Sequence, residues 1–146
     1  MFRDYVSDIL MGELFIEPRG GDEMRRALGT EIFLQEYRTI NFNYGRCSGK
    51  TYAGAELIRM CVEENQNAIM LVMNQALARH VKDSHSDIAD RIFDIGSFTQ
   101  KSRGNPLVDN CRFVIFDEPN YMNKNHISDA MKVLARAGAK TIVRLG

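Results

Sequence analysis

The segment NFNYGRCSGKTYAGAELIRM (41–60) contains a glycine-flanked turn between an apolar run and an amphipathic run. TINFNY (39–44) predicts a short strand that leads into the turn, and TYAGAELIRMCVEEN (51–65) predicts a helix that leaves it. In that helix, apolar side chains follow one face and charged side chains the other, so the apolar face is expected to pack against a core. A strand, a glycine turn and an amphipathic helix in this order predict an α/β fold.

The rest of the chain repeats this alternation of strand and helix. NAIMLVMN (67–74) and CRFVIFDE (111–118) contain long apolar runs, as strands buried on both faces do. Strands separated by helices predict a mainly parallel, five-stranded core sheet with helices on both faces, reached by right-handed crossovers. The other expected elements are strands at 91–98 and 140–146, helices at 75–90 and 125–138, and a mobile polar loop at 99–110.

Two helices are expected before the sheet. The first covers 2–15, where apolar side chains recur at helical spacing, and the second covers 22–37, with Gly29 as a weak point in its middle. The predicted organisation is an N-terminal helical extension at 1–38 and an α/β core at 39–146, which together form a single domain.

Length and composition are those of a globular protein. The chain has 146 residues, 45% of them hydrophobic, and its nineteen basic residues balance nineteen acidic ones. A neutral chain does not by itself indicate nucleic acid or an anionic membrane as a partner. Three cysteines without a close pair favour reduced thiols, and Asp4 and Asp8 are unlike a signal peptide. Since no apolar run reaches membrane-spanning length, we expect a cytoplasmic protein with no membrane partner.

The turn Gly45-Arg46-Cys47-Ser48-Gly49-Lys50-Thr51 has residues typical of a phosphate-binding loop. In such a loop, successive backbone N–H groups surround the phosphate oxygens, a lysine reaches the terminal phosphates, and a Ser or Thr hydroxyl holds Mg²⁺. Residues 49–51 supply the last three positions of the pattern GxxxxGK[ST], but Tyr44 stands where its first glycine is expected. The alternative interpretation is a tight turn with a solvated lysine.

Two adjacent acids, Asp117 and Glu118, end the buried-type strand at 111–118, directly after the apolar residues 113–116. Neighbouring carboxylates at the end of a buried strand are costly unless they face a cation. Ligands of open α/β sheets bind outside the carboxyl ends of the strands, where both this pair and the glycine turn are expected. An acidic turn before Pro119 would explain the acids alone, but the two motifs together predict a Mg²⁺–nucleotide site.

The two motifs resemble Walker A and Walker B of the P-loop NTPases, in the ASCE branch, where a catalytic glutamate stands next to the metal-linked aspartate. The arginine-containing turn is similar to the Walker A of phage terminase large subunits, [GS]RxxGK[ST]. The strand at 67–74 and its following helix are similar to the segment after Walker A in terminases and in superfamily 1 and 2 helicases, and 141–146 is placed like their coupling strand. The resemblance covers about residues 35–146 and implies a three-layer, RecA-like fold.

The resemblance implies a role for each residue of the two motifs. Lys50 would bind the β- and γ-phosphates of ATP, while Thr51 and Asp117 would hold Mg²⁺. Glu118 would activate the attacking water. The cofactors implied are therefore Mg²⁺ and ATP.

Further contacts are implied around the nucleotide. The remaining backbone of the cradle would come from Gly45, Cys47, Ser48 and Gly49. Arg46 would approach the γ-phosphate as an arginine supplied in cis, and its alternative is a solvated arginine. Gln35 would contact adenine as helicase-type glutamines do, and its alternative is an ordinary glutamine on a helix surface.

By resemblance, the chain is an ATPase linked to DNA packaging, translocation or remodelling, with DNA as a second partner. A terminase carries a nuclease and a helicase carries a second RecA-like domain, and we find the signature of neither. We therefore expect an ATPase fragment, or a minimal ATPase whose remaining motor parts come from a protein partner or a homo-oligomer. The alternative is a hydrolysis-poor nucleotide-binding module that associates with a larger motor or regulates it. The terminase-like turn favours a viral or bacterial origin, and a viral protein would lie in the host cytoplasm.

Overall fold

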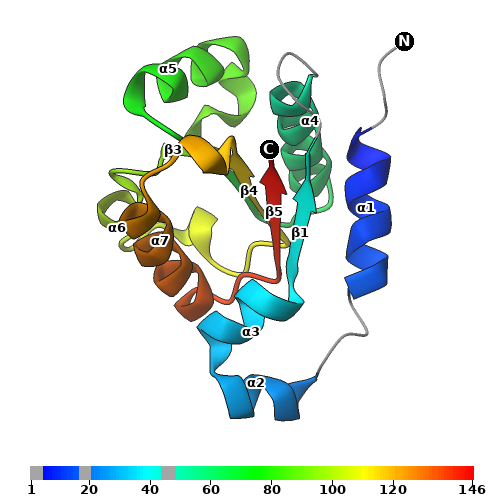
Figure 1. Cartoon of the computed structure of the whole chain (residues 1–146). Helices are drawn as coiled ribbons and strands as arrows, with labels where there is room; N and C mark the ends of the chain where they lie inside the picture. Colours follow the sequence, from blue (N-terminus) through cyan, green and yellow to red (C-terminus); the bar gives the residue numbers. More distant parts are fainter. Residues whose placement is uncertain (1–4, 17–20, 44–48) are drawn as a thin grey trace.

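The computed structural model describes residues 5–16, 21–43 and 49–146, and its centre is one parallel sheet (Figure 1). The strands lie in the order β1-β5-β4-β2-β3, and all four neighbouring pairs are parallel. The predicted α/β fold with a five-stranded, mainly parallel sheet is therefore confirmed. The strands are β1 (Thr39–Phe42), β2 (Ala68–Val72), β3 (Ile92–Asp94), β4 (Phe113–Asp117) and β5 (Thr141–Leu145).

Helices cover both faces of the sheet. Against one face pack α1 (Tyr5–Ile16), α4 (Lys50–Glu63) and α5 (Gln75–Ser84), and against the other α3 (Thr30–Tyr37), α6 (Phe98–Lys101) and α7 (Lys124–Arg136). Consecutive strand residues alternate between the two cores: Ile115 faces the first and Val114 the second. Both faces are dry, which explains the long apolar runs in the sequence of these strands.

The helix expected at 22–37 is two helices, α2 (Asp22–Leu28) and α3, and this prediction is wrong. Gly29 lies between them with φ of +84° and ψ of 154°, a conformation that side-chain-bearing residues rarely adopt. A Cβ at Gly29 would meet no atom within 4 Å, so the backbone conformation alone calls for glycine here. No residue of α2 is buried, so little packing opposes the break.

The helix expected at 75–90 also divides, into α5 and the 3-10 helix η1 (Ser86–Arg91). The break falls at His85, whose φ of −135° and ψ of 60° are not helical. Arg59 of α4 holds both sides of the break, because it donates two hydrogen bonds to Asp87 and lies 2.8 Å from Nδ1 of His85. These contacts between elements far apart in the chain override the helical pattern of the sequence.

The segment at 99–110 is more structured than the expected polar loop. It contains the end of α6 and the 3-10 helix η2 (Pro106–Val108), and Val108 is buried. The amide of Asn67 donates to the carbonyls of Pro106 and Asp109, at 3.0 and 2.8 Å. Packing and hydrogen bonds therefore hold the segment to the rest of the molecule, while its mobility stays a prediction.

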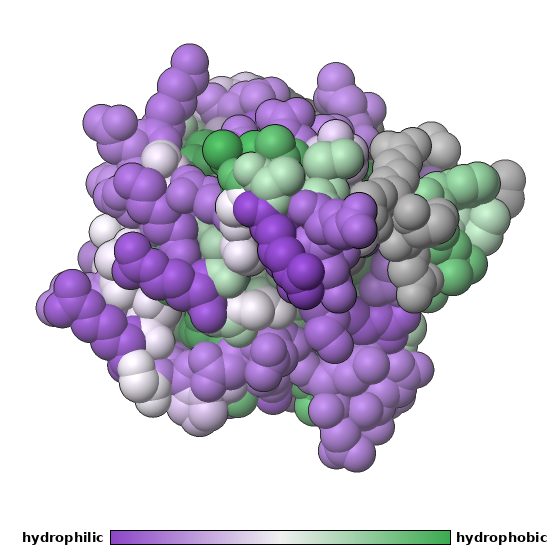
Figure 2. All heavy atoms as spheres, turned by 90° about the horizontal axis from the view of Figure 1, so that it is seen from below, coloured by the Kyte–Doolittle hydropathy of each residue, from purple (hydrophilic) through white to green (hydrophobic). Residues whose placement is uncertain are grey.

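Helix α1 carries apolar side chains on both its faces. Its inner face meets the sheet closely at Gly12, where a Cβ would lie 3.0 Å from Cδ1 of Ile40. Figure 2 shows hydrophobic atoms at the side where α1 lies in Figure 1, and the exposed apolar residues of this helix are Met11, Leu14 and Phe15. Among the described helices, none has the length and apolar character needed to cross a membrane.

Candidate functional site

The two predicted motifs lie at the same edge of the sheet. Lys50 begins α4, and Asp117 ends β4, which is a central strand. Because every strand is parallel to its neighbours, all carboxyl ends meet at this edge, where open α/β sheets bind ligands. Four predicted cradle residues lie outside the described residues, so their contacts stay predictions: Gly45, Arg46, Cys47 and Ser48.

Two neighbouring side-chain pairs join the start of α4 to the end of β4. Lys50 forms an ion pair with Glu118, and the hydroxyl of Thr51 donates to Oδ2 of Asp117 at 2.8 Å. The side chain of Lys50 is only 6% exposed, and that of Glu118 is 20% exposed. The lysine and hydroxyl of one motif thus meet the two acids of the other.

Asp117 is the most deeply buried charged residue of the site, with 1% of its surface exposed. Burial raises the pKa of its carboxyl above the ordinary value, and the negative charge of Glu118 adds to this, while the Thr51 hydrogen bond and Lys50 oppose it. Its second oxygen, Oδ1, is buried without a hydrogen-bond partner among residues 5–16, 21–43 and 49–146. An unsatisfied buried carboxylate oxygen is costly, and a cation would satisfy it.

Glu118 has a strained backbone. Its φ of 56° and ψ of 54° are left-handed, which is uncommon for a residue other than glycine. Its N–H donates to the carbonyl of Leu145 on β5 at 2.9 Å, and the 3-10 helix η3 (Pro119–Tyr121) follows. Such strain is typical of functional sites, where the surrounding structure holds a side chain in one direction. Here the side chain is directed to Lys50.

Two glycines position α4 at this edge. Gly49 caps the helix with φ of +80° and ψ of 13°, so the positive end of α4 faces the site. Gly54, one turn later, lies against the sheet, and a Cβ there would come within 2.5 Å of Cε of Met70. Sequence reasoning did not single out Gly54. A glycine inside an otherwise good helix pattern was the available signal for close packing.

The protein alone supplies too few ligands to surround a Mg²⁺ ion at this site. The described residues contain no group of three or more His, Cys, Asp or Glu suited to a metal. Mg²⁺, however, keeps several waters and is usually bound by one or two protein oxygens together with substrate phosphates. The Thr51 hydroxyl and the unsatisfied oxygen of Asp117 fit that requirement.

Gln35 is not brought to the other predicted site residues. It is exposed on α3, which precedes β1 and lies at the lower, amino end of that strand in Figure 1. It lines a pocket with Thr39 and Arg144 on the sheet face opposite α4. Its contact with adenine is untested, and the observed placement does not support it.

Asp94 is a third acid at this edge and is buried like Asp117, and sequence reasoning did not single it out. It ends β3, level with Asp117 across the intervening strand β2. Ser97 donates both its N–H and its hydroxyl to Asp94, and Lys101 lies 3.4 Å away. Burial works against the charge of Asp94, but these contacts outweigh it and hold its pKa below the ordinary value. Asp94 therefore closes the turn after β3, whereas Asp117 keeps an oxygen available.

Comparison of the chain with protein-family models gives no match, and comparison with curated proteins gives no significant match. Neither result bears on the resemblance to P-loop NTPases. Function is therefore inferred from the residues and their geometry.

Proposed function

We propose that the chain binds Mg²⁺–ATP at the edge formed by residues 49–51 and 117–118 and hydrolyses it. The observation that carries this proposal is the double pairing of Lys50 with Glu118 and of Thr51 with Asp117. A tight turn with a solvated lysine would leave Lys50 exposed, and a simple acidic turn would leave Asp117 exposed. Both residues are buried, at 5% and 1%, which supports a cation- and phosphate-binding site.

The contacts indicate how the site would work. Lys50 and Glu118 neutralise each other when no phosphate is present. On nucleotide binding, the ammonium of Lys50 would turn to the terminal phosphate oxygens, and the carboxylate of Glu118 would be released to accept a proton from water. Bound Mg²⁺ would neutralise charge on the phosphates, next to the hydroxyl of Thr51 and the free oxygen of Asp117. Arg46 would add a cation in cis, as the terminase-like turn implies.

The resemblance to terminases and helicases supports DNA as the polymer on which such an ATPase acts, with a protein partner or further copies of the chain completing the motor. The Lys50–Glu118 ion pair also favours a second candidate, a nucleotide-binding module that hydrolyses poorly. A base paired with the phosphate-binding lysine is not free to activate water until something separates them. ATP turnover measured with and without DNA discriminates the two: DNA-stimulated turnover supports the motor, and binding without turnover supports the module.

The test of the shared site is the substitution Lys50→Ala. It removes the cation on the terminal phosphates and leaves Glu118 unpaired, so we expect affinity for Mg²⁺–ATP to fall at least about tenfold, an energy of about 1.4 kcal/mol. Titration calorimetry measures this, with Lys132→Ala, an exposed lysine on α7, as the matched control. Equal affinity in wild type and Lys50→Ala would show that the turn is not a phosphate site.

A further inference from the structure

The pocket that Gln35 lines lies on the sheet face opposite α4, between the helices α3 and α7 and the strands β1, β4 and β5. Its volume is about 260 Å³, which exceeds the roughly 150 Å³ of a cavity that holds benzene. The floor is apolar and is made by Phe116, Ile127, Met131 and Ile142, and the rim is polar and is made by Gln35, Glu36, Thr39, Asn41 and Arg144.

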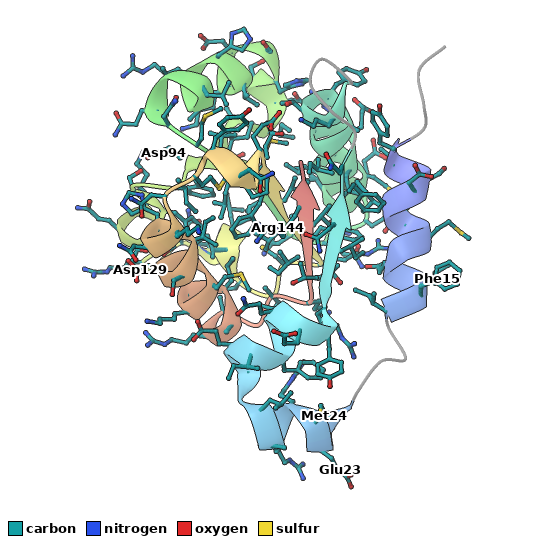
Figure 3. The ribbon with its side chains drawn as sticks, viewed as in Figure 1. Phe15, Glu23, Met24, Asp94, Asp129 and Arg144 are labelled. Carbon is teal, nitrogen blue, oxygen red and sulfur yellow. The ribbon has the colours of Figure 1, made fainter. Side chains whose placement is uncertain are left out.

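Arg144 is the distinctive residue of this pocket. It is half-buried on β5, near the centre of the molecule in Figure 3. Its side chain forms no hydrogen bond, ion pair or ring contact with any residue in the described ranges, whereas Arg59 and Arg112 each hold carboxylates. A partly buried guanidinium has five donors in a planar fork that matches an oxyanion. Arg144 is therefore placed to bind an anionic group of a ligand.

The other lining residues restrict the class of that ligand. The apolar floor favours an apolar body, and the acid Glu36 on the rim disfavours a multiply charged group such as phosphate. We propose that the pocket binds a small organic monocarboxylate, with its carboxylate on Arg144 and its apolar body over Phe116 and Ile142.

The pocket is connected to the strained acid on the other side of the sheet edge. Phe116 precedes Asp117, and Arg144 precedes Leu145, whose carbonyl accepts the N–H of Glu118. The pocket and Glu118 are therefore joined through neighbouring backbone of β4 and β5. Binding of the acid does not depend on the proposed ATPase function.

The test uses phenylpropionate as the probe and the full chain without nucleotide. We expect saturable binding by calorimetry, with amide shifts in nuclear magnetic resonance spectra centred on residues 116, 142 and 144. The uncharged analogue phenylpropanamide and the variant Arg144→Gln should each lower affinity about tenfold or more, while Arg103→Gln, an exposed arginine outside the pocket, should not.

Several results would overturn the proposal. These are the absence of saturable binding to wild type, shifts centred on another part of the molecule, or equal affinity for the amide. Inorganic phosphate that binds Arg144 as tightly as the acid would overturn the ligand class. Because nucleotide is absent, failure of this test and failure of the ATP site are separate outcomes.

Discussion

Lys50 and Glu118 hold each other in an ion pair, and in the proposed ATPase this pair would have to open before Glu118 could act on water. The carboxylate of Glu118 is directed at the lysine by a left-handed backbone that is unfavourable for glutamate. At the scale of single residues, Glu118 is therefore held on Lys50, and binding of a phosphate to Lys50 would release its carboxylate.

The substitution Glu118→Gln tests the proposed catalytic role of this residue. The side-chain shape is kept, so binding of Mg²⁺–ATP should persist, while turnover should fall by roughly 10²–10⁴, the usual contribution of a positioned general base. Single-turnover and steady-state assays with the control Glu63→Gln, an exposed acid on α4, measure this. If wild type and Glu118→Gln turn over at the same rate, Glu118 is not the base.

The substitution Asp117→Asn tests whether this carboxylate serves Mg²⁺. The substitution removes the charge beside Thr51. The ratio of ATP affinity measured with Mg²⁺ to ATP affinity measured with EDTA should therefore be smaller than in wild type. Asp129→Asn, on α7 (Figure 3), is the exposed control. An unchanged Mg²⁺ dependence in Asp117→Asn would show that this carboxylate does not serve the cation.

The same substitution should change how stability depends on pH. Burial raises the folded-state pKa of Asp117 above its ordinary value of 3.8, so the carboxyl stabilises the fold when protonated and this contribution is lost as pH rises. At neutral pH, Asp117→Asn should therefore have a higher free energy of unfolding than wild type, and the difference should vanish well below pH 3.8. Denaturation with urea at several pH values checks this. A difference that grows in acid would show that the sign is wrong.

At the scale of elements, the site depends on how closely α4 approaches the sheet. Gly54 leaves the helix in contact with Met70 and Ile115, and both lie on the floor of the first core. Since α4 carries Lys50 and Thr51, its distance from β4 sets whether these side chains reach Asp117 and Glu118. Helix–sheet packing and the chemistry of the site are coupled through this glycine.

The substitution Gly54→Leu should move α4 away from the sheet. Overpacking of a dense core typically costs about 1–3 kcal/mol, and the displaced Lys50 and Thr51 should lower ATP affinity as well. Gly54→Ala is the matched control, because its Cβ meets the flexible end of Met70 and alanine favours the helix by about 1 kcal/mol. Thermal unfolding and calorimetry measure both effects. If Gly54→Leu binds ATP like wild type, the position of α4 does not limit the site.

At the scale of the whole molecule, one arginine connects the N-terminal helix to the core. Arg112, at the start of β4, donates two hydrogen bonds to Glu13 of α1 and one each to Glu64 and Gln66 after α4. Hydrogen bonding to Glu13 raises the pKa of Arg112, so the charge persists at any ordinary pH. Together with the contact between Gly12 and Ile40 of β1, this network attaches α1 to the sheet at β1 and at the amino end of β4.

The substitution Arg112→Gln should loosen α1. Loss of these charge-assisted hydrogen bonds should cost about 1–3 kcal/mol, at the lower end because solvent partly screens them, and high salt should reduce the difference from wild type. Urea denaturation and amide hydrogen exchange in α1 measure this, with the exposed Arg136→Gln as control. Faster exchange throughout the sheet, with α1 unaffected, would contradict the attachment.

Much of the fold could be read from the sequence because its signals are local. Apolar runs marked the five strands, and their alternation with helices marked the parallel sheet. Element ends were less predictable. Gly29 ends a helix because it adopts a backbone conformation open to glycine, and helix propensities reflect this only weakly. The break at His85 depends on Arg59, a residue of another helix.

The sequence by itself determined the α/β class, the parallel sheet and the two motifs, because strand periodicity and the residues after each strand are properties of short segments. Only the tertiary structure decided that Lys50 meets Glu118, that one oxygen of Asp117 has no partner in the described part of the chain, and that Arg144 lines a separate pocket. These features depend on strand order and on helix–sheet distance. Both result from packing between segments that are distant in the chain, and no local pattern encodes them.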